Sequence, residues 1–197
     1  MSMKIIELVI DEDAENVAVD AVSLVREPAI ETDWYALNKQ KKYALKLNED
    51  KRIITGPALI PQKQIFRSDR ENGDYYIWFS KQTVAKCNEL FFKNYNQKNV
   101  TFEHEYAVDG NFIFESWIKE DDTNDKSNLY NFDAPVGTWF ISMKIENDEV
   151  WNAVKDGSVR GYSIEGHFAD ALELSKTETT DQKLLNTIKQ IISENAK

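Results

Sequence analysis

The chain has 197 residues, of which 42% are hydrophobic and 12% aromatic, and its formal net charge is −10. This length is typical of one domain with a sizeable core, and the acidic balance argues against a nucleic-acid partner because phosphate binding requires a positive surface. The single cysteine, Cys87, excludes an internal disulfide and is typical of a reducing compartment. One cysteine and two histidines are too few for a structural zinc site, so we expect no metal and no cofactor.

The N-terminal half predicts several strands and one helix. Apolar and β-branched residues favour four strands, over 4–11, 17–25, 51–61 and 73–80. Residues 80–95 predict a helix that begins after Ser80 and carries Cys87 on its buried face. The N-terminus lacks the apolar core of a signal peptide, and no apolar run approaches the roughly 18–20 residues of a membrane span. We therefore expect a cytosolic protein that is soluble and has no membrane partner.

The middle of the sequence predicts two paired strands. Residues 99–108 alternate between apolar and polar side chains, which predicts one strand with His104 on its apolar face. The Asp-Gly dipeptide at 109–110 predicts a hairpin turn into a second strand over 111–118. Residues 119–128 are polar and predict a mobile loop.

The last third predicts a strand over 136–145, a short helix over 147–157 that begins at Asn147 or Asp148, and a strand that contains Ser163. Many short strands with two or three helices indicate an α+β fold built on a small barrel or sandwich. We expect one domain over residues 1–175. An amphipathic helix or tail is expected over 176–197.

The stretch "SVRGYSIEGHF", residues 158–168, contains a candidate nucleophile, Ser163. Strand alternation places Ser163, Glu165 and His167 on one face, opposite the apolar residues. A serine in this position is also compatible with a plain surface residue. His167 is an unsuitable base because four residues along a strand span roughly 13 Å.

His104 is the better candidate for a general base. It lies in the middle of an apolar strand face, where an imidazole needs a polar partner. The alternative is a core histidine bonded to a backbone carbonyl. The sequence leaves open whether the strands of His104 and Ser163 are neighbours.

Three segments together carry a resemblance: "VDAVSLVREPAIE", "VTFEHEY…ESWI" and "PVGTWFISMKI…VWNAVKDGSVRGYSIEGHF". In combination, over roughly residues 15–170, they resemble the XkdF-type phage serine proteases, relatives of the prohead maturation proteases of tailed phages. The resemblance implies a small antiparallel β-barrel flanked by helices, as in the herpesvirus capsid proteases. It also implies a serine–histidine centre, which falls on Ser163 and His104.

The third catalytic residue departs from the family pattern. In the family, an acid precedes a "VSLV–PA" stretch that follows the serine, whereas here this stretch lies near the N-terminus at 21–29 and Ala21 occupies the place of the acid. This order indicates a circular permutation. Asp20 is one residue away and needs a β-bulge to reach the same face. Glu165 shares the face of Ser163, about 6–7 Å along the strand. The resemblance therefore implies a dyad, or a triad completed by Asp20 or another acid.

The resemblance further implies oxyanion or substrate contacts and a biological role. Backbone amides near Ser163 and the guanidinium groups of Arg160 and Arg26 are the candidates, with solvated surface charges as the alternative. The expected role is that of a capsid maturation endopeptidase in the assembling prohead in the host cytoplasm. Its partners would be the scaffold protein, the major capsid protein and, by analogy, a second copy of the chain.

Two other functions stay open. One is an inactive structural or scaffold-associated assembly protein with the same fold. The other is a small-molecule hydrolase, which would need a pocket of several hundred Å³.

Overall fold

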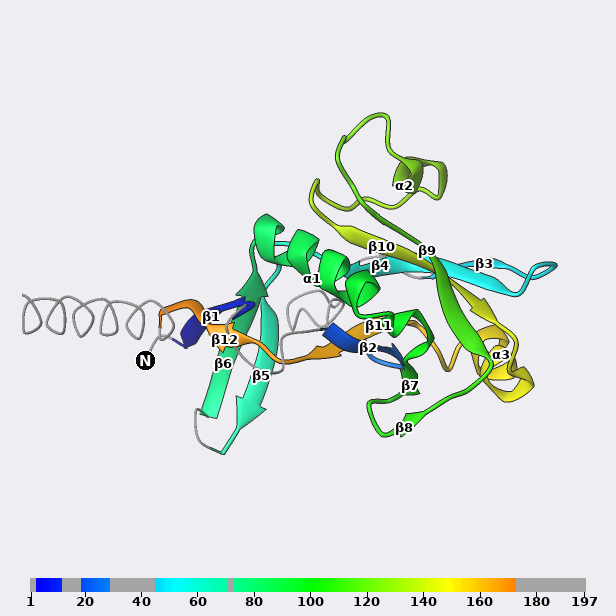
Figure 1. The fold of residues 1–197 in the computed structure, drawn as a ribbon, viewed down its shortest axis with the longest axis horizontal. Coiled ribbons are helices and arrows are strands. Elements are labelled where there is room, and N and C mark those ends of the chain that lie inside the picture. Colours follow the sequence, from blue (N-terminus) through cyan, green and yellow to red (C-terminus); the bar gives the residue numbers. More distant parts are fainter. Residues whose placement is uncertain (1–2, 12–18, 29–44, 71–72, 173–197) are drawn as a thin grey trace, which may run out of the picture.

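The computed structural model describes residues 3–11, 19–28, 45–70 and 73–172, and strands predominate in this part of the chain (Figure 1). Its strands form three four-stranded sheets, accompanied by three α-helices and one short 3₁₀ helix. The α+β class predicted from the sequence is therefore confirmed.

The first sheet has the strand order β12-β1-β6-β5. Its strands are β1 (Lys4–Val9), β5 (Ile65–Asp69), β6 (Gly73–Phe79) and β12 (Ala169–Asp170). β1 and β6 run parallel, while β5 and β12 are antiparallel to their neighbours. β5 has little apolar character and was not predicted.

The second sheet is antiparallel throughout, with the order β3-β4-β10-β9. It contains β3 (Lys46–Asn48), β4 (Ile53–Leu59), β9 (Asn111–Ile118) and β10 (Trp139–Ile145). β10 is buried along almost its whole length, because its neighbours cover its edges and other elements cover both faces. It therefore forms the centre of the core.

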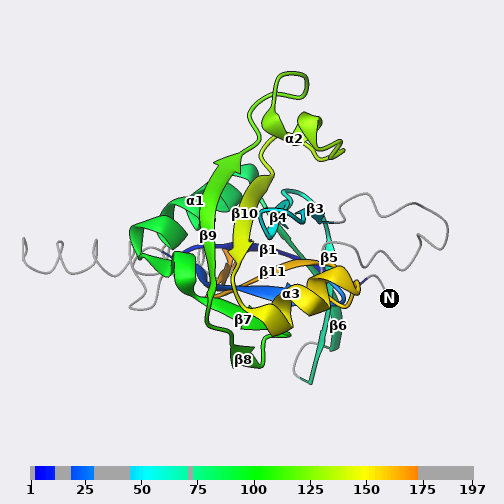
Figure 2. The same cartoon turned by 90° about the vertical axis from the view of Figure 1, so that its right-hand side faces the viewer.

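The third sheet has the order β11-β2-β7-β8 and carries the candidate residues. Its strands are β2 (Val19–Val25), β7 (Val100–Phe102), β8 (Tyr106–Ala107) and β11 (Gly161–Gly166). β2 pairs antiparallel with β11 and parallel with β7. Segments from the two ends and the middle of the chain thus meet in one sheet (Figures 1 and 2).

The longer helices begin where their capping residues predict. α1 (Lys81–Lys93) begins after Ser80, whose Oγ accepts a hydrogen bond from the Thr83 N–H. It packs against β2, β9 and β10. Burial raises the pKa of its Cys87 thiol to about 12, which is typical of a cysteine in the core.

The other helices are shorter. α3 (Asp148–Lys155) is capped in the same way by Asn147. α2 (Lys126–Leu129) is a single turn within the polar loop, and the 3₁₀ helix η1 spans Asn96–Lys98. No helix in the described ranges is long and apolar enough to cross a membrane.

The expected closed barrel is not present in the described part of the chain. β11 ends its sheet and forms no ladder with β4, although the two strands are in contact. The contact includes the buried Tyr162 side chain, whose hydroxyl donates to the Ile54 carbonyl of β4 at 2.9 Å, in place of a backbone ladder.

Two local predictions were also wrong. Residues 99–108 are not one strand but the hairpin β7–β8. The Asp-Gly dipeptide does not pair that segment with β9, because β9 pairs with β10. Gly110 has a positive φ of 75°, and its carbonyl accepts from the N–H groups of Glu146 and Asn147. The predicted helix or tail over 176–197 lies outside the described residues.

Candidate active site

The third sheet has one apolar face and one polar face. Tyr162 and Leu24 are fully buried on the apolar face. The polar face carries a row of hydroxyl side chains, because Ser163 lies opposite Ser23 and Ser23 lies opposite Thr101. Directly opposed residues are about 4.5–5.5 Å apart, so the three hydroxyl groups form a continuous line across three strands.

His104 lies in the turn of the β7–β8 hairpin rather than on a strand face. Glu103 and His104 have positive φ values of 52° and 61°, and the Glu105 N–H donates to the Phe102 carbonyl at 3.0 Å. These are the features of a type I′ turn, which normally contains Asn and Gly. Two left-handed residues with side chains store strain of roughly 1–3 kcal/mol each. Such strain persists only where the surroundings fix it.

The end of β2 fixes this turn. The Glu103 N–H donates to the Leu24 carbonyl at 3.0 Å, and the His104 N–H donates to Ser23 Oγ at 2.9 Å. In return, the Arg26 N–H donates to Glu103 Oε1 at 2.7 Å. The backbone of His104 is therefore held directly above the serine that pairs with Ser163.

Glu165 orients the imidazole of His104. Nδ1 of His104 lies 3.0 Å from Glu165 Oε1, and the Thr101 hydroxyl donates to the same oxygen. Thr101 thus fixes the carboxylate of Glu165, and the carboxylate in turn binds the imidazole of His104. Nε2 of His104 has no hydrogen-bond partner among the described residues, and the side chain is 43% exposed. This leaves one nitrogen oriented by an acid and the other available for a proton.

Ser163 lies two residues before Glu165 on the same strand and the same face. It is half-buried, and its hydroxyl makes no hydrogen bond within the described part of the chain, including none to His104. Catalytic contacts often tighten only when substrate binds. The arrangement supplies a free hydroxyl, an oriented imidazole and a carboxylate, which together suit acyl transfer.

Asp20, the predicted third residue, lies elsewhere. A bulge falls between Glu165 and Gly166, which pair with Ala21 and Val19 and leave Asp20 as the extra residue on β2. The bulge that the sequence interpretation required is therefore present. However, Asp20 Oδ2 lies 3.3 Å from Nδ1 of His167, not near His104.

The two candidate arginines lie at the far end of the same strand pair. Arg160 precedes β11, and its Nε donates to the Gly157 carbonyl at 3.3 Å. Arg26 follows β2, and its guanidinium lies 6.0 Å from the centre of the Phe102 ring. Both are exposed. Neither makes a described contact with Ser163, so their roles stay predictions.

A cavity of about 560 Å³ adjoins Ser163. Its lining includes residues 162–166 of β11 together with side chains from β1, β5 and β6. Ser163 and Glu165 thus lie at the boundary between the first and third sheets, whereas His104 is not among the residues that line this cavity. The described residues contain no cluster of three or more His, Cys, Asp or Glu that could hold a metal ion.

Comparison with known proteins identifies one family. The family model described as "Putative phage serine protease XkdF" matches residues 40–173, more than half of the chain. The matched region contains His104, Ser163 and Glu165, and it begins after β2. No curated protein and no solved structure matches the chain.

Proposed function

Because the chain belongs to the XkdF family of phage serine proteases, we propose that it is an endopeptidase whose nucleophile is Ser163. The observation that carries the proposal is the 3.0 Å contact between His104 Nδ1 and Glu165 Oε1, two residues from a serine hydroxyl without a hydrogen bond in the described structure. An imidazole held by a carboxylate is the acid–base half of the arrangement that serine hydrolases share on unrelated folds, and the contact between His104 and Ser163 that would complete it is part of the proposal.

In the proposed reaction, Ser163 Oγ attacks the carbonyl carbon of the scissile bond while its proton passes to His104 Nε2. Collapse of the tetrahedral intermediate breaks the C–N bond, and His104 returns the proton to the leaving amine. Water then hydrolyses the acyl ester with His104 again as base. Glu165 holds the imidazole in the tautomer with hydrogen on Nδ1 and stabilises the imidazolium that forms.

In this proposal, Glu165 supplies the carboxylate that is missing at position 21, where the family has an acid and this chain has Ala21. Ala21 pairs with Glu165 in the β2–β11 ladder. The side chains of directly opposed residues share one face, about 4.5–5.5 Å apart at Cβ. A glutamate on β11 can therefore deliver its carboxylate to the position that residue 21 would otherwise fill. The position of β2 between β11 and β7 supports the proposed circular permutation.

The proposed biological role is cleavage of scaffold or capsid protein segments inside the assembling prohead, in the host cytoplasm. The family assignment to phage supports this role. A homodimer and the oxyanion contacts of Arg160 and Arg26 belong to the same proposal. The cavity volume of about 560 Å³ favours a second candidate, a small-molecule hydrolase.

The test is intact-mass analysis of scaffold and capsid proteins from the same genome after co-expression with the chain. Defined cleavage products are expected with the wild type and are expected to vanish with Ser163→Ala and His104→Ala. Glu165→Gln should slow cleavage by about 10²- to 10⁴-fold, because a neutral amide does not stabilise the imidazolium.

Asp20→Asn and His167→Gln are the matched controls, since this acid–imidazole pair lies outside the proposed centre. Loss of cleavage in Asp20→Asn but not in Glu165→Gln would assign the third position to Asp20. If the scaffold and capsid proteins stay intact in every sample but still bind the chain, the result would support the alternative that the chain is an inactive assembly protein. Hydrolysis of short esters alone would support the small-molecule hydrolase.

A further inference from the structure

The cavity beside Ser163 lies along the free edge of β11. Five consecutive residues, 162–166, line it. Side chains of a strand alternate between two faces, so an unbroken run of lining residues means that the strand edge itself faces the cavity. β11 is the last strand of its sheet in the described structure. Beyond Tyr162, which contacts β4, this edge forms no ladder with another described strand, and its N–H and C=O groups are suited to pair with an added strand.

The wall opposite this edge is apolar. Ile6, Ile77 and Ile65 lie in one row across β1, β6 and β5, and all three line the cavity. All three are buried. We call this row the isoleucine floor, and it offers a surface for a bulky apolar side chain.

A cationic row lies two residues away on the same three strands. It consists of Lys4, Tyr75 and Arg67, which also line the cavity. Two residues along a strand span about 6–7 Å. The apolar and the cationic contacts are thus close enough for one short peptide to reach both.

Only one of the two cations in this row is paired with a carboxylate in the described structure. Lys4 Nζ lies 3.6 Å from Asp170 Oδ2. Arg67 donates to the carbonyl of the preceding residue at 3.0 Å and has no carboxylate partner among the described residues. Arg67 is half-buried, and burial lowers the pKa of its guanidinium. An anionic ligand group would compensate this desolvated charge.

We propose that the cavity binds an extended peptide as an additional strand on β11, with a bulky apolar side chain on the isoleucine floor and a carboxylate against Arg67. The substrate class is thus a peptide with an acidic residue close to an aliphatic or aromatic one. This inference rests on the proposed endopeptidase function, because it assigns the substrate of the same site.

The test measures binding and cleavage separately with the full chain. Binding is measured by selecting a positional library of acetylated, amidated octapeptides on the Ser163→Ala variant, which cannot cleave the peptides. Cleavage of the same library is measured with the chain in which Ser163 is intact. We expect selected peptides to carry Asp or Glu within two positions of a bulky apolar residue. Replacing that acid by its amide, or Arg67 by Gln, should each weaken binding by about tenfold.

Two further variants make the result independent of folding defects. Arg67→Glu should shift the preference from acidic to basic peptides, a gain that a misfolded protein does not produce. Arg70→Gln is the matched control, because Arg70 is exposed and does not line the cavity.

The outcomes separate the inference from the function. Arg67-dependent binding without cleavage would support the peptide site and contradict the endopeptidase. Cleavage that requires Ser163 but does not depend on Arg67 or on an acidic residue would overturn the inference and leave the endopeptidase standing. Cross-linking of another segment of the chain itself into the cavity would also overturn the inference.

Discussion

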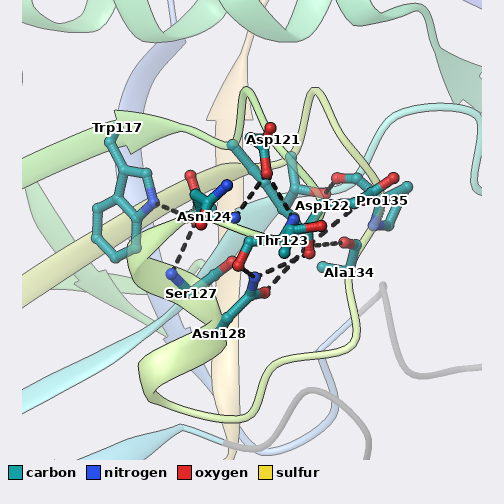
Figure 3. A network of polar contacts seen from close by, with 12 residues as sticks. Trp117, Asp121, Asp122, Thr123, Asn124, Ser127, Asn128, Ala134 and Pro135 are labelled. Carbon is teal, nitrogen blue, oxygen red and sulfur yellow. Dashed lines mark hydrogen bonds and ion pairs between the residues drawn. The ribbon is translucent and has the colours of Figure 1, made fainter.

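The loop that contains α2 and the polar face of the third sheet are both held by hydrogen bonds between polar groups, but the sheet also carries one hydroxyl group, that of Ser163, that is left for a ligand. In the loop, polar groups bind one another (Figure 3). Asp121 accepts from the N–H groups of Thr123 and Asn124, each at 2.6 Å, and the Asn128 amide donates to two backbone carbonyls. On the sheet, the Ser163 hydroxyl has no such partner in the described structure. A hydroxyl group without a partner is available for chemistry only where a ligand can reach it: Ser163 lines a cavity, whereas Ser127 Oγ in the loop is buried.

Lys119 shows the structural use most clearly. Its side chain is only 4% exposed, and Nζ lies 2.8 Å from the Ala134 carbonyl, 3.4 Å from Asn128 Oδ1 and 3.7 Å from Asp122 Oδ1. A buried ammonium is tolerated only when it is paired and hydrogen-bonded. This residue therefore ties the loop to the end of β9.

The largest effect on stability is expected for Lys119→Met. Methionine keeps the buried stem but removes the donor, which leaves the Ala134 carbonyl unsatisfied and costs about 1–3 kcal/mol in the free energy of unfolding. Urea denaturation measures the loss. The exposed Lys155→Met is the control. If both variants unfold at the same urea concentration, the loop contributes less to stability than its contacts indicate.

A smaller difference in the free energy of unfolding is expected between substitutions of Ser23 and Ser163, which lie opposite each other in the β2–β11 ladder. Ser23 is fully buried and accepts from the His104 N–H, so Ser23→Ala should cost about 1–2 kcal/mol. Ser163→Ala removes a hydroxyl without a described hydrogen bond and should change stability by less than about 0.5 kcal/mol. The same denaturation experiment compares them. The reverse order of effects would mean that Ser163 is the structural serine of the pair.

Local sequence signals predicted those parts of the fold that depend on neighbouring residues. Ser80 correctly marked the start of α1, and of the two candidate caps for α3, Asn147 and Asp148, the structure shows Asn147. The β7–β8 hairpin was missed because its turn lacks the usual Asn-Gly signal, so the alternating pattern continued through Glu103 and His104. The pairing of β9 with β10 also could not be read from the adjacent Asp-Gly dipeptide, since sheet pairing is decided by distant segments.

The candidate site was predictable in its residue types but not in its geometry. The sequence and the resemblance indicate Ser163 and His104, and the structure places Ser163 on the polar face of the third sheet and His104 in the β7–β8 turn, bonded to Ser23 of that face. The sequence identifies Glu165 only as a residue on the same strand face as Ser163. Its contact with His104 depends on the register that pairs it with Ala21, and register is not visible in a single strand. Asp20 has the required bulge but binds a different histidine.

The smallest predicted effect is the pH dependence of the contribution that Glu115 makes to the free energy of unfolding. Burial alone would raise the pKa of Glu115, but hydrogen bonds from Lys126 and Ser142 outweigh it and lower the pKa. A lowered pKa in the folded state means that the contribution to stability is present above the unfolded value of about 4.3 and is lost as the pH falls through the folded value. The Glu115 and Lys126 side chains are 34% and 39% exposed, so screening keeps this contribution below about 1 kcal/mol.

We therefore expect Glu115→Gln to be less stable than the wild type at pH 7 and to approach it below pH 4 or so, as measured by urea denaturation across this range. Exposed Glu146→Gln serves as the control, because it removes the same charge from an acidic chain without touching Lys126 or Ser142. A difference between the wild type and Glu115→Gln that does not change with pH would show that Glu115 contributes through its shape and not through its charge. In that case the contact with Lys126 would not help to fix α2 on β9.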